Sequence, residues 1–410
     1  MSYKRKTLMT LILLLLMAGC GRETETLDRS KESPKQRSSS NMEQSFAAGE
    51  QKFALALFHE IIKQEGTSEN VLISPYSVQQ ALAMTANGAQ GDSRTEILDT
   101  LYLHQMNISD INKTSKSLLQ SFQSLPNGEL SAANSVWSKR EIKKSFIDRI
   151  TGLGNAYQLD QDPKQAADQV NGWVSKKTKG RIDRIIDDVG PDILAYIINT
   201  VYFKESWKEE FDQHLTVDQP FYSEAGSAKK HPMMTQTNRF PYLQNKHFQA
   251  VKLPFKDERL SLAVFLPEKT ENLQSFLKRL TYQNWRRWQA GWKMKQVELK
   301  LPKFSFETEA ILNTPLKKLG MRTVFQQADF SNLFAGKDEA YINEVKHNTF
   351  IKVNEAGTEA AAATKVEIVE SASVPDVVMT ADRPFYFAVI DEKTGIILFL
   401  GSVVDPGKTS

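Results

Sequence analysis

The sequence has little cysteine and little net charge, and both shortages exclude classes of protein. Cys20 is the only cysteine among the 410 residues, so the chain forms no internal disulfide and its core must hold the fold. The 52 basic and 49 acidic residues give a net charge of +3, and loss of Lys4, Arg5 and Lys6 with a cleaved leader would reduce that charge to zero. A neutral chain has no general attraction for phosphate backbones, so we expect no nucleic-acid partner.

The N-terminus also lacks a hydrophobic run long enough to cross a bilayer. Residues 8–17 are largely apolar and follow a basic start, which is typical of a signal segment. Cys20 follows directly after Ala18 and Gly19, and this arrangement resembles a bacterial lipoprotein cleavage box, although Met17 stands where leucine is usual. We therefore expect a signal peptide over 1–19 and acylation of Cys20. The chain would be a membrane-anchored lipoprotein of a bacterium, at the outer membrane or cell surface, because Gly21 gives no aspartate retention signal.

The remaining sequence predicts a tether followed by one large domain. Residues 21–45 are charged and serine-rich without aromatic residues, so we expect 20–45 to form a lipidated, disordered tether. Residues 46–406 show no change in composition and no repeat, which favours a single domain, with a short tail at 407–410. Strand-like runs are scattered at 195–203, 248–266, 296–306, 385–390 and 396–404. Helical runs lie at 50–64, 77–88, 112–123 and 163–178. This pattern predicts an α+β fold, with large sheets covered by helices.

Catalytic and metal-binding patterns are fragmentary. Ser227–Lys230 fits S-x-x-K and 393–395 fits K-T-G, but the first lies in a turn-like stretch, the second fits a hairpin turn, and S-D-N is missing. The histidines are scattered without metal-ligand spacing; they are His59, His104, His214, His231, His247 and His347. We therefore predict no enzyme activity, no cofactor and no metal site.

Residues 354–370 (NEAGTEAAAATKVEIVE) alternate with a period of two. One side carries Thr358, Ala360, Ala362, Thr364, Val366 and Ile368, and the other carries Glu359, Ala361, Ala363, Lys365, Glu367 and Val369. This alternation favours a strand with one buried face, while the alanines are also compatible with a helix. The tract continues into a stretch of small and polar residues with Pro375 and Pro384, which predicts a long exposed loop.

Several motifs in one order resemble the serpin family over about 46–406. The tract at 355–363 is similar to the hinge of the mobile reactive loop in serpins, and residues 383–406 are similar to the C-terminal strands of these proteins. Residues 70–97 resemble the segment that runs from a buried strand into a helix. The motifs ANSVW, VNGWVSKKTKGRI, INTVYFKESWKEEFD and LPKFSFE follow in family order.

The resemblance implies a serpin fold with large mixed and antiparallel sheets, and an exposed mobile reactive loop over about 355–383. The expected activity is inhibition of a serine protease, as a monomer, through a covalent acyl-enzyme and insertion of the cleaved loop into the main sheet. Small side chains on the face that would become buried, those of Thr358, Ala360, Ala362 and Thr364, would favour this insertion. The predicted hinge residues are Glu355, Gly357, Thr358, Glu359, Ala360, Ala361, Ala362 and Ala363.

In serpins the reactive bond usually follows the seventeenth residue counted with the hinge glutamate as the first. The resemblance therefore implies a reactive bond between Ser371 and Ala372, with Val369, Glu370 and Ala372 as further candidates for the residue before the bond. A small residue after Ile368 and Val369 suits elastase-like or subtilisin-like proteases better than trypsin-like ones. Whether cysteine proteases are also inhibited stays open.

The resemblance further implies a polar cluster that controls strand separation, formed by His347, Ser74, Ser77 and Asn199. It also implies pairing of Glu355 with Lys303 beside Trp207. Two alternatives stay open at this point. The first is a non-inhibitory carrier with the same fold. The second concerns residues 278–295, where basic residues alternate with tryptophans; a solvated helix packed through its tryptophans is favoured over a polyanion site.

Overall fold

The computed structural model describes residues 34–125, 128–190, 194–335, 340–358 and 374–408, and the side chains of these from residue 41 onward. The chain divides into two units, Met1–Asn41 and Met42–Ser410. Of the first unit only the helical residues from Pro34 are described. The second unit contains the whole of the expected domain, and the following paragraphs concern this unit.

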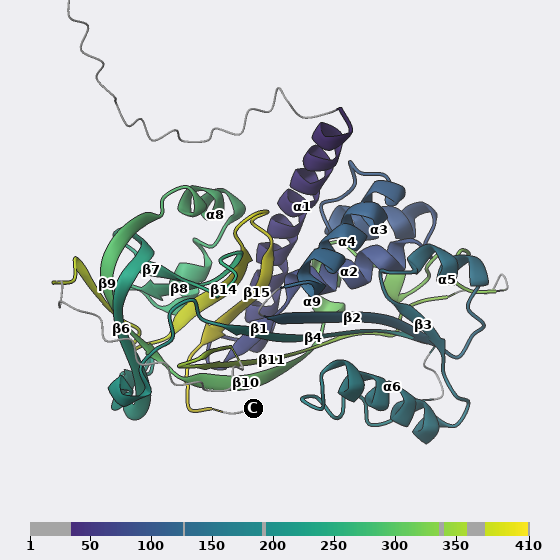
Figure 1. Ribbon diagram of the computed structural model, residues 1–410. Helices are drawn as coiled ribbons and strands as arrows, with labels where there is room; N and C mark the ends of the chain where they lie inside the picture. The colour runs from purple at the N-terminus through teal and green to yellow at the C-terminus, as the bar shows by residue number, and fades with distance from the viewer. Residues whose placement is uncertain (1–33, 126–127, 191–193, 336–339, 359–373, 409–410) are drawn as a thin grey trace, which may run out of the picture. The chain divides into compact units, whose positions relative to one another are not determined.

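Helices cover both faces of one sheet and part of a second (Figure 1). The α-helices are α1 (Pro34–Glu65), α2 (Pro75–Ala86), α3 (Gly91–Thr100), α4 (Ile108–Gln123), α5 (Lys144–Ile150), α6 (Pro163–Lys177), α7 (Leu273–Leu277), α8 (Tyr282–Gln289) and α9 (Asn313–Lys318), with 3-10 turns at Gln213–Leu215 and Thr323–Phe325. Capping residues define several starts. For example, Ser74 accepts a hydrogen bond from the Ser77 N–H and Pro75 occupies the first turn of α2.

The first sheet has six strands in the order β10-β11-β12-β4-β2-β3, with a further direct pairing of β11 and β4. Its strands are β2 (Glu129–Ser138), β3 (Asn155–Gln158), β4 (Ala195–Ser206), β10 (Phe304–Ile311), β11 (Glu344–Asn354) and β12 (Gly357–Thr358). Helices α2 and α4 pack on one face, and α6 packs on the other (Figure 1). A separate apolar cluster, which includes Trp137, Val174 and Ile198, fills the space beneath α6.

The second sheet has nine strands in the order β1-β15-β14-β8-β7-β6-β9-β13, with β5 paired to β6. Its strands are β1 (Val71–Ile73), β5 (Val217–Tyr222), β6 (Ala228–Gln244), β7 (Phe248–Pro254), β8 (Leu260–Pro267), β9 (Lys293–Pro302), β13 (Val377–Thr380), β14 (Phe385–Asp391) and β15 (Ile397–Val403). Every residue of β8, β14 and β15 is buried, which explains their continuous apolar sequences. Within the described residues, no helix combines the length and apolarity needed to cross a membrane.

The α+β prediction is confirmed, and several element boundaries differ from those expected. The run 248–266 is two strands, β7 and β8, because Glu258 adopts a positive φ of 58° in the turn between them. Helix α8 buries Trp285 and Trp288 and exposes Arg286 and Arg287. The solvated-helix interpretation is therefore confirmed over Tyr282–Gln289, whereas Lys293 and Lys295 lie in β9. A polyanion site there is untested.

The predicted disordered tether is wrong over residues 34–45, because α1 begins at Pro34. Proline is favourable in a first helical turn, and the residues that follow are compatible with a helix. Each residue added to an existing helix gains one hydrogen bond, so extending a helix costs much less free energy than starting one. Burial of Phe46 and Phe53 fixes the helix, and it extends from there into the polar segment before it. The predicted leader at 1–19, Cys20 and the remainder of the tether lie outside the described residues.

Candidate functional site

The hinge residues Gly357 and Thr358 lie between two strands of the six-stranded sheet. They pair with β11, Thr358 opposite Val353, and with β4, Thr358 opposite Glu205. Gly357 has a φ of 145°, and a Cβ at this position would overlap the backbone of Glu205 and Ser206. Only glycine fits this close approach between strands. The side chain of Asn354 accepts hydrogen bonds from the N–H groups of Ala356 (3.1 Å) and Gly357 (3.2 Å), which fixes the turn that leads into β12.

Strands β4 and β11 pair directly with each other below the hinge. The pairing is parallel, from Tyr196 opposite Glu344 to Val201 opposite Thr349. Within the described residues, this direct pairing ends there, and beyond it β12 lies between the two strands and pairs with both. β12 therefore occupies the first position of a strand that could extend between β4 and β11.

A hydrogen-bonded cluster joins β4 and β11 to helix α2 at the centre of this paired region. Nδ1 of His347 lies 2.6 Å from Oδ1 of Asn199, and Nε2 of His347 accepts from the Ser74 N–H at 2.9 Å. The Asn199 amide donates to Oγ of Ser77 (2.5 Å) and also faces Oδ1 of Asn134 (2.6 Å). All five side chains are buried. The contact with the Ser74 N–H requires an unprotonated Nε2, so His347 is neutral with its proton on Nδ1.

Burial lowers the pKa of His347 to about 3, against an ordinary value of 6.5, and the hydrogen bond with Asn199 opposes this shift only in part. A proton added at Nε2 would displace the hydrogen bond from Ser74 and leave a buried charge. The cluster therefore holds β4 and β11 together in its neutral form.

At the hinge, Glu355 forms an ion pair that lies beside Trp207. Its Oε2 is 3.0 Å from Nζ of Lys303, and its Oε1 accepts from Oγ1 of Thr216 at 2.9 Å. Burial acts to raise the pKa of Glu355, but its backbone hydrogen bond, the hydrogen bonds from Lys303 and Thr216, and the Lys303 charge lower that pKa overall. The Trp207 indole N–H donates to the Asn354 carbonyl (2.8 Å), and its ring stacks on Phe255 with centroids 4.8 Å apart. The turn before β12 is thus held on both sides.

The structure describes nine of the predicted site residues and places them in two groups along β4 and β11. Ser74, Ser77, Asn199 and His347 form the hydrogen-bonded cluster, and Trp207, Lys303, Glu355, Gly357 and Thr358 lie at the hinge. The other predicted hinge and reactive-bond residues lie outside the described residues; they are Glu359, Ala360, Ala361, Ala362, Ala363, Val369, Glu370, Ser371 and Ala372. Sequence reasoning missed Asn134, Thr216 and Glu205. Only Glu205 left a signal, as a charged residue at a buried position of a largely apolar strand.

The partial catalytic motifs S-x-x-K and K-T-G lie at turns. Ser227 ends the turn that precedes β6, and 393–395 form the turn between β14 and β15, where Gly395 N–H donates to the Asp391 carbonyl. Among the described residues, no three His, Cys, Asp or Glu side chains gather as metal ligands do.

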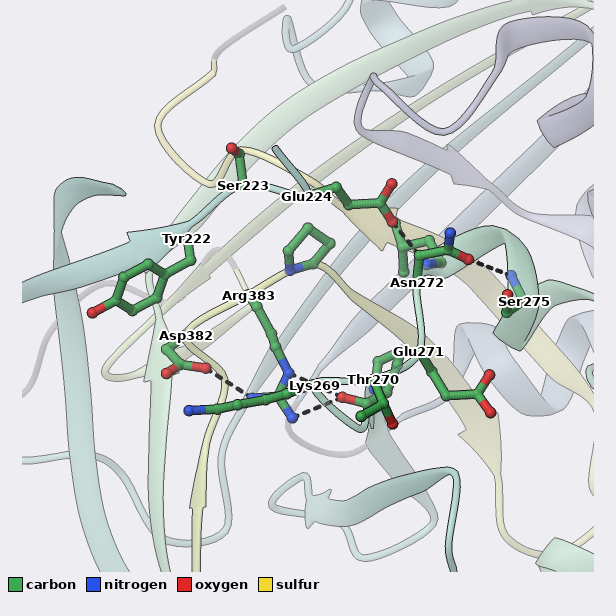
Figure 2. Close-up of a pocket in the computed structure, with 13 residues that line it drawn as sticks. Tyr222, Ser223, Glu224, Lys269, Thr270, Glu271, Asn272, Ser275, Asp382 and Arg383 are labelled. Atoms are coloured by element: carbon green, nitrogen blue, oxygen red, sulfur yellow. Dashed lines mark hydrogen bonds and ion pairs between the residues drawn. The ribbon is translucent and has the colours of Figure 1, made fainter. Parts of the chain in front are cut away.

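A pocket of about 450 Å³ lies elsewhere, where the ends of β5 and β8 meet the segment before β14 (Figure 2). Arg383 is fixed at one side of this pocket, because Nη2 donates to the Pro267 carbonyl (2.7 Å) and Nη1 to Asp382 (2.9 Å). Its lining is Tyr222, Ser223, Glu224, Pro267, Lys269, Thr270, Glu271, Asn272, Leu273, Ser275, Asp382, Arg383 and Pro384. The hinge residues do not line it.

Comparison with known proteins defines the class of the molecule. The family model described as Serpin (serine protease inhibitor) matches residues 48–406, so the chain belongs to the serpin family. A serpin-like protein of Thermococcus kodakarensis is 34% identical over 369 residues, which covers 86% of this chain and 84% of the relative. Leukocyte elastase inhibitor A of Rattus norvegicus is 30% identical over 375 residues, covering 86% and 97% of the two chains. The crystal structure of the thermophilic serpin tengpin in the native state has a TM-score of 0.81 and 30% identity, covering 88% of this chain and 94% of tengpin. Serpins are in general inhibitors of serine proteases rather than enzymes.

The neutral state of His347 predicts loss of stability in acid. A group with a lowered folded pKa stabilises the fold fully above its unfolded pKa and loses this contribution as the pH falls, here from 6.5 towards 3. We expect the loss to be about 1.4 kcal/mol per pH unit in that range. The unfolding temperature should be measured from pH 7 to pH 5 for the wild type and for H347Q. The wild type should show the steeper decline, and parallel curves would contradict this role.

The ion pair between Glu355 and Lys303 is expected to contribute little to the unfolding temperature. Since Lys303 is 40% exposed, K303A should lower the unfolding temperature by only about 1–3 °C. The matched control is K300A, because Lys300 forms an ion pair with Glu298 on β9, away from the hinge. We expect K303A, but not K300A, to speed the loss of the native form during incubation below the unfolding temperature. Equal rates for the two variants would show that Glu355 needs no restraint from Lys303.

Proposed function

We propose that this serpin inhibits a serine protease by trapping the acyl-enzyme, with its cleaved reactive loop inserted between β4 and β11. The observation that carries the proposal is the position of β12, which already pairs with both strands at the point where they separate. Extension of this pairing would exchange one parallel ladder for two antiparallel ladders. The protease, joined to the loop through its acyl bond, would be carried along and distorted.

The observed register defines what an inserted strand would meet. With Thr358 opposite Glu205 and Val353, Ala360 would come opposite Phe203 and Ile351, and Ala362 opposite Val201 and Thr349. These positions face the buried side, where small residues enter without overlapping the core. Val366 and Ile368 would follow beside Ile197 and Ala195, and each would bury apolar surface worth roughly 2 kcal/mol. Because β4 begins at Ala195, the sheet accommodates the loop up to about Ile368.

In an inserted strand, the same register would bring Thr364 opposite both Asn199 and His347. These two residues are direct partners before insertion, so the arriving strand must break their 2.6 Å hydrogen bond. A threonine hydroxyl both donates and accepts, so Thr364 can replace the lost bond on each side. The cluster therefore opposes opening of the sheet without preventing its completion.

A scissile bond near Ser371 fits this geometry, because the few residues after Ile368 would connect the filled sheet to the bound enzyme. The small residue Ser371, which follows Ile368 and Val369 in the sequence, favours an elastase-like or subtilisin-like target. The similarity to leukocyte elastase inhibitor A supports the same class. Val369, Glu370 and Ala372 remain alternatives for the residue before the bond.

The pocket near Arg383 favours a second candidate, a carrier with the serpin fold. It mixes charged side chains with Tyr222, Leu273 and proline rings, as small-molecule sites do. Such a carrier would be cleaved by the protease without retaining it. The small inward residues of the hinge favour inhibition over this alternative.

We also propose that the mature chain begins at an acylated Cys20 and is held at the outer membrane or cell surface of a bacterium. Several acyl chains bind a bilayer firmly, since each buried methylene contributes roughly 0.8 kcal/mol. The polar segment after Cys20 would separate the inhibitor from the membrane surface.

Inhibition can be tested with a matched pair of loop variants. A362R would place a bulky charge on the buried side of the inserted strand, whereas A361R would place it on the opposite side. With elastase or subtilisin, we expect an SDS-stable complex with the wild type and with A361R, and at least a tenfold loss of complex with A362R, which should instead be cleaved as a substrate. Cleavage should raise the unfolding temperature of the wild type and of A361R only. Cleavage of all three proteins without an adduct would support the carrier.

Anchoring can be tested by fractionation of bacteria that express the full chain. We expect the wild type and M17L, which restores the usual leucine, to sediment with membranes and to carry acyl groups on Cys20 by mass spectrometry. C20A should lose both properties. Sedimentation of C20A with the membranes would show that some other segment anchors the protein.

A further inference from the structure

The pocket beside Arg383 is formed by three segments that are distant in the sequence (Figure 2). Its lining comes from within residues 222–224 at the end of β5, 267–275 from the end of β8 into α7, and 382–384 between β13 and β14. Hydrogen bonds join these segments. The Tyr222 N–H donates to the Asp382 carbonyl (2.7 Å), and Nε of Arg383 donates to the Pro267 carbonyl (3.0 Å). The cavity is therefore built into the fold, and its volume of about 450 Å³ is in the range of small-molecule sites.

One side of the pocket is cationic. The Arg383 side chain is only 17% exposed, and it is fixed by bonds from Nε and Nη2 to the Pro267 carbonyl and from Nη1 to Asp382. Since each terminal nitrogen of a guanidinium carries a pair of N–H groups, Nη1 and Nη2 each keep one N–H for a ligand. Lys269 lines the same side (Figure 2), and its ammonium group forms no ion pair or hydrogen bond with the residues that the structure describes. A fixed guanidinium beside a free lysine is suited to binding a carboxylate.

The other side of the pocket carries Glu224. Figure 2 shows its carboxyl group across the pocket from the ends of Lys269 and Arg383. Oε1 of Glu224 accepts a hydrogen bond from the Leu273 N–H (2.7 Å) at the start of α7. Its Oε2 has no hydrogen-bond partner within the described part of the chain. This oxygen can therefore accept a hydrogen bond from a cationic group of a ligand.

The remaining acidic groups of the lining are already paired. Asp382 binds Arg383. Oε1 of Glu271 lies 2.6 Å from Nδ1 of His247 and 3.0 Å from Nη2 of Arg279. The hydrogen bond with His247, and then the one with Arg279, lower the pKa of Glu271. This carboxyl group is therefore ionised and committed to partners that do not line the pocket.

Apolar surface completes the lining. Pro267, Leu273 and Pro384 are buried residues, and Tyr222 is 42% exposed. A ligand with a single charge would satisfy one side of the pocket and leave the charged group on the other side without a partner. A ligand with both charges and an apolar body satisfies the whole lining.

We propose that the pocket binds a zwitterionic ligand with an apolar body, whose carboxylate pairs with Arg383 and Lys269 and whose ammonium group pairs with Glu224. A short apolar peptide with free termini has this chemistry. Each residue of an extended peptide spans roughly 3.5 Å, so the termini of a dipeptide lie further apart than the charged groups of a single amino acid. The opposed positions of Glu224 and Lys269 in Figure 2 require such a separation.

This inference goes beyond the inhibition proposed above, because the hinge residues do not line the pocket. It gives a ligand class to the carrier alternative and applies equally to an inhibitor. Binding is therefore measured with the full chain in the absence of any protease.

The test compares the dipeptide Leu-Leu with two of its derivatives by isothermal titration calorimetry at pH 7. N-acetyl-Leu-Leu lacks the ammonium group, and Leu-Leu amide lacks the carboxylate. We expect Leu-Leu to bind and each derivative to bind at least about tenfold more weakly, because each loses one charge-assisted hydrogen bond in a partly buried site.

Variants assign each charge of the ligand to one side of the pocket. E224Q keeps an oxygen that can accept from the Leu273 N–H, and it should bind Leu-Leu about tenfold more weakly and no longer distinguish it from N-acetyl-Leu-Leu. K269Q changes an exposed side chain. It should weaken Leu-Leu binding about threefold and reduce the difference between Leu-Leu and its amide, which Arg383 maintains in part. The matched control is K278Q, because Lys278 is exposed at the end of α7 but does not line the pocket. It should bind all the ligands as the wild type does.

Absence of Leu-Leu binding at millimolar concentration would overturn the proposal, as would equal affinities for Leu-Leu and its derivatives. A loss in K278Q as large as the losses in E224Q and K269Q would also overturn it. Complex formation with elastase is measured separately. Absence of the complex together with intact binding of Leu-Leu would reject inhibition and leave the pocket assignment standing. A complex without peptide binding would do the reverse.

Discussion

The parallel pairing of β4 with β11 is the constraint on which the rest of the structure depends. It runs for six residue pairs and then gives way to the two residues of β12. Backbone groups of separating strands must find other partners, and β12 supplies them at the hinge. Extension of β12 would satisfy the same groups with two new ladders. Under the proposed function, the sheet is closed by a pairing for which the chain itself carries a replacement, and such a state would be held kinetically rather than by being the most stable arrangement.

Three features of different chemistry act on this pairing. The cluster of His347, Asn199 and Ser77 joins the two strands to α2 through hydrogen bonds that require a neutral imidazole. The pair of Glu355 and Lys303 holds the turn before the hinge through charge. Helix α6 covers the opposite face through apolar contacts, among them those of Val174 and Ile198. Buried polar groups of this kind contribute to a unique arrangement more than to net stability, which suits a sheet that must close in one register and later open.

The sequence was sufficient for the fold class and for the family, because these rest on apolar periodicity and on motifs that are local in the chain. It also singled out nine residues that the structure places along β4 and β11. It was insufficient where the environment is created by distant segments. Glu205 gives no sign that Gly128 makes room for its carboxyl group, since the two residues meet only through sheet pairing. Asn134 and Thr216 were missed for the same reason. The prediction for residues 34–45 was wrong because their polar composition indicates only that they are exposed to water. The helix that includes them is fixed by burial of Phe46 and Phe53 further along the chain.

The position of Trp207 has a practical consequence. Its indole stacks on Phe255 and donates to the backbone of Asn354, directly beneath the turn that leads to the hinge. The other indoles lie in two distant groups, with Trp137 and Trp173 near α6 and Trp285, Trp288 and Trp292 around α8. Indole emission depends on the polarity and packing around the ring. The molecule therefore contains its own optical label at the place where the proposed insertion would begin, and this label can be isolated by replacing the other tryptophans with phenylalanine.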